Sequence, residues 1–265
     1  MALTDYKAIN EGFYKEQKWA LDRNKEKYLA NALKLKLINS FLKPSEKDIV
    51  LDAGGGVGNW AFAIKDKVKK VIVLDISKIA LSLIKEKDIG KKQGSLAKIP
   101  FDQNHFDKII CIDALEHLKK EDLPKALSEL KRVLKPNGIL AVYASCDGFY
   151  ITKPWIKKID KKDGHLSRLS FKEWKKLIPF KIERVIFFGH FFERIARWIF
   201  EFSIRLYSGL AGKKDIKQVK GEFKTTEKIP MIFKVYLRLL TLLTSLDIVL
   251  FGKIEGAAIF LRLRK

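Results

Sequence analysis

Acidic residues and glycines follow apolar runs in this chain at a spacing that can hold a ligand against the backbone. One apolar run leads into Asp52 and then into glycines at every second position, Gly54, Gly56 and Gly58. Such a run predicts a buried parallel strand. The glycines permit a sharp turn and a close approach of bare backbone, which a Cβ would prevent. A strand, a glycine turn and a helix beginning near Asn59 form the first half of a nucleotide-binding βαβ unit.

The spacing of these glycines narrows the choice of ligand. A dinucleotide-binding turn needs a third glycine at the position of Asn59, and a P-loop needs Gly-Lys followed by Ser or Thr, which the chain lacks here. The turn therefore predicts a nucleotide-like ligand without a pyrophosphate. A glycine-rich turn that binds nothing is the alternative on this motif alone.

The residues that follow favour a bound ligand. A second apolar run, 70–76, reaches Asp75, which lies 21 positions after Gly54. A carboxylate at this distance can accept both hydroxyls of a ribose from the tip of the neighbouring strand. Strand-like and helix-like segments continue to alternate up to about residue 145, which is typical of a parallel α/β sheet.

The motifs along this stretch also occur together in one family. They read VLDAGGGVG at 50–58, GSLAKIPF at 94–101, FDKI at 106–109, LEHL at 115–118 and LKPNG at 134–138. In this order they resemble the type 11 group of class I S-adenosylmethionine (SAM)-dependent methyltransferases over about residues 45–145. The chain departs from the family at two positions: Ser95 replaces an Asp that touches the adenine amino group, and Gly55 replaces a Cys or Ser.

The resemblance implies a fold and a cofactor. The fold is a Rossmann-like seven-stranded sheet with helices on both faces, and the cofactor is SAM. The methionine end of SAM would lie over Asp52, Gly54 and Gly56, and the ribose at Asp75 and Ile76. The family's remaining positions correspond to Ser95 and Leu96 beside the adenine, and to Asp113 facing the reacting centre.

Transfer of a methyl group to an oxygen or carbon acceptor requires a base to take a proton. The candidates are His117, His165 and Asp113. We expect His117 to open the helix after Asp113, where it either faces the cleft or caps and packs. His165 belongs to a long loop, 146–169, of a length that usually serves a function. No spacing of His, Cys and Asp residues indicates a metal site.

The remaining segments define three regions. Residues 8–43 carry a helical period, and we expect residues 1–44 to form an N-terminal helical cap. The resemblance places such a cap over the SAM site, which makes Tyr14, Trp19 and Arg23 candidates for the border of the pocket. Residues 45–188 with 253–265 form the SAM-binding core. Residues 189–252, between the sixth and seventh strands, form an insert of amphipathic helices with an aromatic, apolar face. Its longest uncharged stretch is too short to span a membrane, and the pattern is typical of a helix in the membrane interface.

The net charge differs between the two halves of the chain. Residues 1–150 carry a net charge of +7 and residues 151–265 a net charge of +15. This excess predicts an anionic partner, a lipid surface before a nucleic acid. Two core helices, or a homodimer formed through the insert, are the alternative for the apolar face. The sequence shows no secretory signal, so we expect a cytoplasmic protein, peripheral at the inner face of the cell membrane.

Three functions compete. The first is a methyltransferase for a lipid, an isoprenoid quinone, a lipid-linked sugar or another small molecule. The second is an RNA methyltransferase, suggested by a pI near 9.8, although no RNA-binding motif is visible. The third is a catalytically silent scaffold with the same fold.

Overall fold

The structure is a computed structural model. It describes residues 29–148, 164–189 and 245–265, and in addition 192, 195, 199, 202–203, 238 and 242–243. The strands are β1 (Ile49–Ala53), β2 (Lys70–Asp75), β3 (Ile89–Gln93), β4 (Phe106–Ile112), β5 (Leu134–Ser145), β6 (Lys181–Phe188) and β7 (Ala258–Arg264). The helices are α2 (Leu29–Leu42), α3 (Asn59–Ile64), α4 (Lys78–Ser82), α5 (Leu123–Val133) and α7 (Phe171–Leu177), with the short 3-10 helices η3 (Lys65–Lys67) and η4 (Leu115–His117).

All seven strands belong to one sheet, in the order β3-β2-β1-β4-β5-β7-β6. The first five pair in parallel, while β7 runs antiparallel between β5 and β6. The strand order reverses beside β1 and β4, and an open α/β sheet binds its ligand at such a point, outside the carboxyl ends of the strands. The predicted seven-stranded class I sheet is confirmed.

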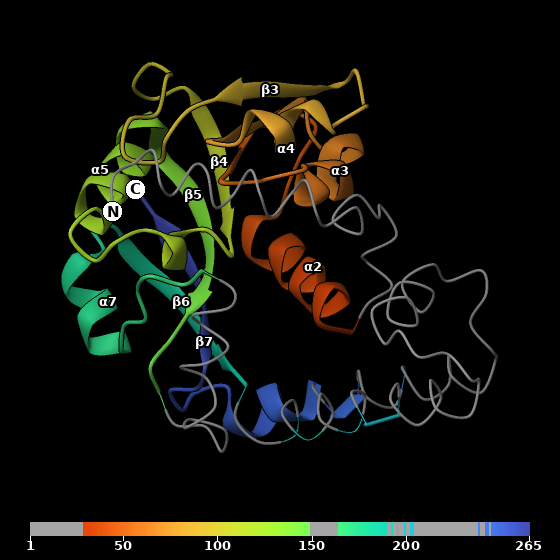
Figure 1. Cartoon of the computed structure of the whole chain (residues 1–265), viewed down its shortest axis with the longest axis vertical. Coiled ribbons are helices and arrows are strands. Elements are labelled where there is room, and N and C mark those ends of the chain that lie inside the picture. The colour runs from red at the N-terminus through yellow and green to blue at the C-terminus, as the bar shows by residue number, and fades with distance from the viewer. Residues whose placement is uncertain are drawn as a thin grey trace.

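Helices cover both faces of this sheet (Figure 1). Alternate residues of β4 point to opposite sides: Ile109 and Cys111 join the core under α5 and α7, and Ile110 and Ile112 join the core under α2 and α3. Trp174 of α7 is 1 % exposed. A strand buried on both faces needs an apolar side chain at every position, which explains the continuous apolar runs in the sequence.

Two strands differ from the pattern of apolar runs. β3 is an edge strand of sequence IGKKQ, and only its first residue is buried, so no apolar run marks it. β5 begins at Leu134, in the LKPNG motif and five residues before Ile139, where its continuous apolar run starts. The pairing with β4 shifts register there, between Phe106 and Lys108. Pro136 cannot donate to a ladder, and Asn137 has a φ of 61°, so this segment bulges from the pairing.

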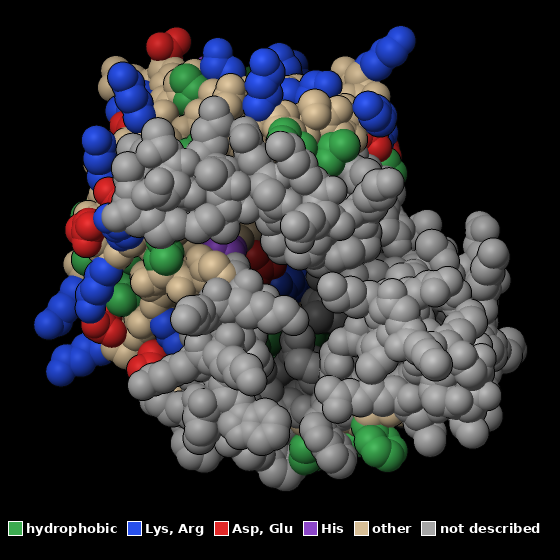
Figure 2. Space-filling view, in the orientation of Figure 1, with side chains coloured by type: hydrophobic (Ala, Val, Ile, Leu, Met, Phe, Trp, Pro, Cys, Tyr) green, Lys and Arg blue, Asp and Glu red, His purple; other side chains and the backbone are tan. Residues whose placement is uncertain are grey.

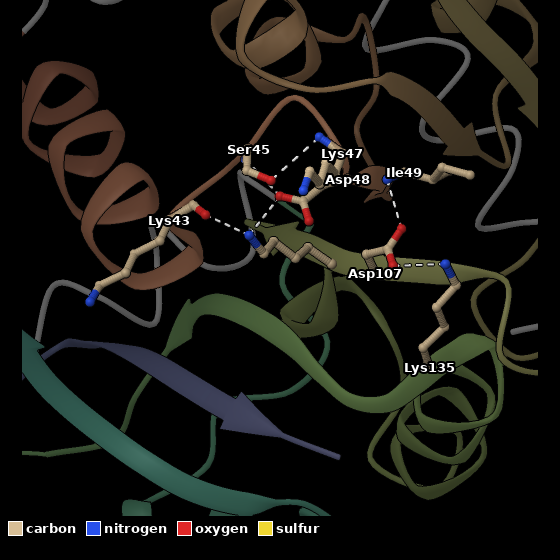
Figure 3. A network of polar contacts seen from close by, with 8 residues as sticks. Lys43, Ser45, Lys47, Asp48, Ile49, Asp107 and Lys135 are labelled. Atoms are coloured by element: carbon tan, nitrogen blue, oxygen red, sulfur yellow. Dashed lines mark hydrogen bonds and ion pairs between the residues drawn. The ribbon is translucent and has the colours of Figure 1, made fainter.

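Lysine–aspartate pairs join the strands at the amino end of the sheet (Figure 3). Lys108 of β4 donates from Nζ to the Asp48 carboxylate at 2.6 Å and to the Lys43 carbonyl at 2.5 Å. Asp107 accepts from the Ile49 backbone N–H at 2.9 Å and from Lys135 at 2.7 Å. These contacts connect the starts of β1, β4 and β5.

The chain forms a further helix just before β7. Residues 245–251 are helical, and the backbone N–H of Phe192 donates to buried Asp247 at 3.0 Å. The opposite side of this segment is apolar and exposed, and green side chains appear at the lower edge of Figure 2. We call Leu242, Leu246, Val249, Leu250 and Ile254 the outer apolar face.

Within the described part of the chain, no helix has both the length and the apolar character needed to cross a membrane. Most of the predicted insert and the first 28 residues of the N-terminal cap lie outside the described residues. The proposed division into three regions therefore stays a prediction.

Candidate functional site

The glycine turn after β1 sits at the carboxyl edge of the sheet. Gly54 has a φ of +71°, and a Cβ placed on it would lie 2.6 Å from the Cβ of Ala114. Its backbone N–H donates to the Leu74 carbonyl of β2 at 2.8 Å. Only glycine combines this conformation with this approach, so the turn holds β1, β2 and the residues after β4 close together.

Asp52 lies beneath the turn as a buried carboxyl with one unused oxygen. It is 1 % exposed, and its Oδ2 accepts the backbone N–H of Ala61 in α3 at 3.0 Å. No described residue hydrogen-bonds its Oδ1. Burial raises the pKa of Asp52 to about 7, and the neighbouring charge of Asp75 adds to the effect.

Asp75 ends β2 and organises the backbone around it. Its Oδ2 accepts the N–H of Gly56 at 2.8 Å and its Oδ1 accepts the N–H of Ser77 at 2.8 Å. Burial raises the pKa of Asp75, although these hydrogen bonds act in the opposite direction. Each carboxylate oxygen keeps a further acceptor site for a ligand hydroxyl. The next residue, Ile76, accepts from the Gln93 side chain through its carbonyl at 3.1 Å.

Ser95 and Leu96 follow β3 in a turn on the same edge. The Ser95 hydroxyl accepts the backbone N–H of Ala97 at 3.2 Å, and Leu96 is buried against the core that contains Ala114. The serine hydroxyl is thus occupied within its own turn, which stabilises the turn where the family carries an aspartate.

Asp113 follows β4 and is paired with a residue that the sequence did not single out. Its backbone has a φ of 53°, and Lys34 of α2 donates to its two oxygens at 2.8 and 2.5 Å. The Lys34 ammonium also lies 3.8 Å from the ring centre of Tyr143. Burial is the largest single effect and lowers the pKa of Lys34, but the charge and hydrogen bond of Asp113, with contributions from Tyr143 and Glu116, outweigh it and leave the pKa raised. Lys34 was missed because nothing in a helical period marks which lysine reaches a distant carboxylate.

The two predicted histidines meet although 48 positions separate them in the sequence. The rings of His117 and His165 lie 5.0 Å apart, edge to face. The Nδ1 of His117 is 3.1 Å from the Gly164 carbonyl, and the Nδ1 of His165 is 3.3 Å from the Ser145 hydroxyl. One detail was wrong: His117 ends the single turn of η4, and the following helix α5 begins only at Leu123.

Glu116 is the second residue that the sequence reading missed. It is 2 % exposed, and among the described residues nothing hydrogen-bonds its Oε2. Burial raises its pKa to about 8, and the charge of Asp113 adds to this. Its position inside the LEHL motif was visible, but its burial required the structure.

The predicted pocket-border residues Tyr14, Trp19 and Arg23 lie outside the described part of the chain, and so do residues 149–163 of the loop. Arg168, at the described end of this loop, donates to the carbonyls of Cys146 and Ala257 at 2.9 and 2.8 Å.

Figure 2 shows a hollow at the middle of the molecule in which histidine, acidic and basic side chains are visible.

The arrangement fits a cationic ligand that carries hydroxyl groups. The orphaned Oδ1 of Asp52 and the two-oxygen acceptor of Asp75 lie on one edge, and a Cβ would fill the space at Gly54. Carboxylates accept hydrogen bonds from ammonium and hydroxyl groups. The described residues include no group of His, Cys, Asp and Glu suited to a metal ion.

Known proteins share this sheet and these motifs. A family model described as "Methyltransferase domain" matches residues 51–142. An uncharacterized methyltransferase-like protein of Schizosaccharomyces pombe is 30 % identical over 166 residues, 60 % of this chain and 59 % of that protein. The ubiquinone/menaquinone biosynthesis C-methyltransferase of Francisella tularensis is 37 % identical over 106 residues, 36 % of this chain and 42 % of the relative. The chain spans about half the length of the curated relatives it matches.

A solved structure extends the fold comparison over most of the chain. The geranyl diphosphate C-methyltransferase of Streptomyces coelicolor superposes with a TM-score of 0.56 at 11 % identity, covering 88 % of this chain and 78 % of that one. The predictions of family, fold and SAM as the cofactor are confirmed. Residues 51–142 are a methyltransferase domain of the class I SAM-dependent type.

Proposed function

We propose that the whole chain transfers a methyl group from SAM to an oxygen or carbon atom of a lipid-type acceptor, such as an isoprenoid quinone or a lipid-linked sugar. When bound, SAM supplies a methyl group on a positively charged sulfur. Asp52 and the backbone of the glycine turn hold its methionine end in this proposal. Asp75 and Ile76 hold the ribose, and Leu96 and Ser95 flank the adenine.

The residues of this chain then have separate tasks. Methyl transfer depends mainly on alignment of acceptor, methyl group and sulfur, and Asp113 with Lys34 fixes the edge of the sheet where these meet. His117 and His165 border the same edge. Since the Nδ1 of His117 faces a carbonyl oxygen, it carries a proton in the neutral ring and leaves Nε2 as the acceptor.

The observation that favours a lipid-type acceptor is the outer apolar face. Val249 is 77 % exposed, and Leu242 and Leu250 are more than half exposed. Arg238 and Lys253 lie exposed on the same segment. An apolar face flanked by basic residues is suited to the interface of an anionic membrane. The relative from Francisella tularensis, named for quinone biosynthesis, supports an acceptor of this kind.

A labelling experiment tests the class of acceptor. The purified protein is incubated with SAM carrying a labelled methyl group and an extract of its own source cells, and the label is counted in lipid, nucleic-acid and protein fractions. Label in the lipid fraction supports the proposal. Label in RNA would replace it with the RNA methyltransferase, and label in no fraction would favour a silent scaffold.

Sedimentation with vesicles tests the outer apolar face separately. A Val249→Asp variant should bind phosphatidylglycerol-containing vesicles about tenfold more weakly than the unmodified protein, because it places a charge where an apolar side chain enters the interface. The matched control is Gln103→Asp, which adds the same charge at an exposed position just before β4. Equal binding by all three proteins would remove the membrane from the proposal.

A further inference from the structure

Hydrogen bonds fix the backbone of Glu116, while one oxygen of its side-chain carboxyl has no described partner. The backbone carbonyl of Glu116 accepts the N–H of Leu166 at 2.8 Å and of Ser167 at 3.0 Å. These bonds tie η4 to the segment before α7. The side chain is buried, and its Oε2 receives no hydrogen bond from the described residues. A buried polar atom left unsatisfied in a native fold is costly and calls for an explanation.

Charged groups surround this carboxyl from several elements. Asp113 at the end of β4 acts against its ionisation, while Lys34 of α2 and Arg168 before α7 favour it. Both cations are engaged elsewhere: Lys34 with the Asp113 carboxylate and Arg168 with two carbonyl oxygens. On β4 itself the Cys111 thiol is buried, and its pKa is raised by burial first and by the charge of Glu116 next.

The two histidines complete these surroundings. His117 follows Glu116 directly in η4, and its ring meets that of His165. Their Nδ1 atoms face a carbonyl oxygen and a serine hydroxyl. Burial and the charge of Asp113 outweigh the hydrogen bond from the Glu116 backbone and the two cations, and raise the pKa of Glu116 to about 8. Most copies of the molecule therefore hold a proton on this carboxyl at neutral pH.

We propose that Glu116 is the proton acceptor of the methyl-transfer site, neutral while the crevice holds no cation and ionised once a cationic ligand occupies it. This inference rests on the proposed function, which places the positively charged sulfur near Asp113. The acceptor atom gains the methyl group and loses its proton to Glu116, and the electron pair of the broken methyl–sulfur bond stays on sulfur. The loss of positive charge from sulfur then favours the protonated carboxyl.

The size of the coupling follows from Coulomb's law. At an effective dielectric constant of about 20, a unit positive charge added to the crevice should lower the pKa of Glu116 by about one to two units. S-Adenosylhomocysteine offers a matched ligand, since its sulfur is neutral and the rest of the molecule is the same except for the methyl group. SAM should therefore release a proton on binding that S-adenosylhomocysteine does not.

Calorimetry measures this release without knowledge of the acceptor. Binding heats at pH 7.5, taken in buffers of different ionisation enthalpy, give the number of protons exchanged. For the unmodified protein we expect SAM to release about half a proton more than S-adenosylhomocysteine, because protons displaced from Asp52 by the shared methionine end are the same for both ligands. Glu116→Gln mimics the protonated carboxyl. It should bind S-adenosylhomocysteine within about threefold of the unmodified protein, bind SAM about 3- to 25-fold more weakly, and release equal numbers of protons with the two ligands. Glu46→Gln, an exposed residue before β1, should behave as the unmodified protein.

Each result has a defined meaning. If Glu116→Gln releases as many more protons with SAM than with S-adenosylhomocysteine as the unmodified protein does, the proposal is overturned. Absence of SAM binding by the unmodified protein would instead refute the proposed function. If Glu116→Gln does not fold, 13C NMR of carboxyl-labelled unmodified protein decides the question. A glutamate signal that titrates near pH 8 with S-adenosylhomocysteine must titrate about one unit lower with SAM, and an unchanged midpoint would refute the inference.

Discussion

Acidic side chains at the amino end of the sheet and at its carboxyl end differ in their pairing and in the direction of their pKa shifts. At the amino end Asp48 and Asp107 are paired with Lys108 and Lys135. Burial, the largest single effect, raises the pKa of Asp107, but the hydrogen bonds from Lys135 and Ile49 together with the Lys135 charge outweigh it and leave the pKa lowered. At the carboxyl end Asp52 and Glu116 each keep an oxygen without a described partner. The pKa values there rise to about 7 and about 8.

This contrast separates residues that hold the fold from residues that await a ligand. A paired carboxylate gains stability when the chain folds, whereas a buried and unpaired one costs stability. Perturbed carboxyls also cluster at functional sites. The carboxyl end of the sheet therefore stores an unfavourable free energy that a cationic ligand can relieve, and the amino end does not.

The largest expected effect concerns the pH dependence of stability. Glu116 has a folded pKa of about 8, above its ordinary value of 4.5, so the native state binds more protons between these values and its stability falls as the pH rises through them. Glu116→Gln abolishes this fall. Its free energy of unfolding relative to the unmodified protein should rise by about 4 kcal/mol between pH 5 and pH 8.5, as measured by urea unfolding.

The amino end supplies the control for this prediction. The pKa of Asp107 is lowered in the fold, so its contribution is present above the unfolded pKa and is lost as the pH falls below it. Asp107→Asn should thus change stability most at neutral pH and least in acid. The same pH trend in both variants would contradict the contrast between the two ends.

A second prediction compares two lysine–aspartate pairs. Lys108→Met leaves largely buried Asp48 without its cation and should lower the free energy of unfolding by about 3 kcal/mol. Lys34→Met leaves Asp113, whose side chain is 46 % exposed, in contact with water and should cost less than about 1 kcal/mol. Equal losses in chemical unfolding would show that the carboxyl end also serves stability.

The sequence predicted those parts of the molecule that local residue type determines. Continuous apolar runs and glycine spacing located β1, β2 and β4 and the turn between them, because buried parallel strands and tight turns constrain residue type locally. β3 was invisible because an edge strand needs few apolar residues. Lys34 and Glu116 were missed because an ion pair over 79 positions and the burial of a carboxyl are tertiary properties.

A third prediction concerns the cofactor. Asp75→Asn replaces one acceptor oxygen by an amide that cannot accept from the N–H groups of Gly56 or Ser77. The dissociation constant of SAM, measured by calorimetry, should rise by about 100-fold. Asp107→Asn, the same replacement at the amino end, should leave it within about threefold. Equal weakening in both variants would mean that the glycine turn is not the SAM site.

The smallest effect tests the glycine that distinguishes this chain from its family. A Cβ on Gly55 would lie 2.5 Å from the Cγ of Asp52, so a serine at this position must turn the carboxyl away from the N–H of Ala61. Gly55→Ser should therefore cost about 1 kcal/mol of unfolding free energy, one hydrogen bond. In an Asp52→Ala background the same substitution has no carboxyl to displace, and its cost should vanish. An undiminished cost there would place the strain in the backbone of the turn and not in the orientation of Asp52.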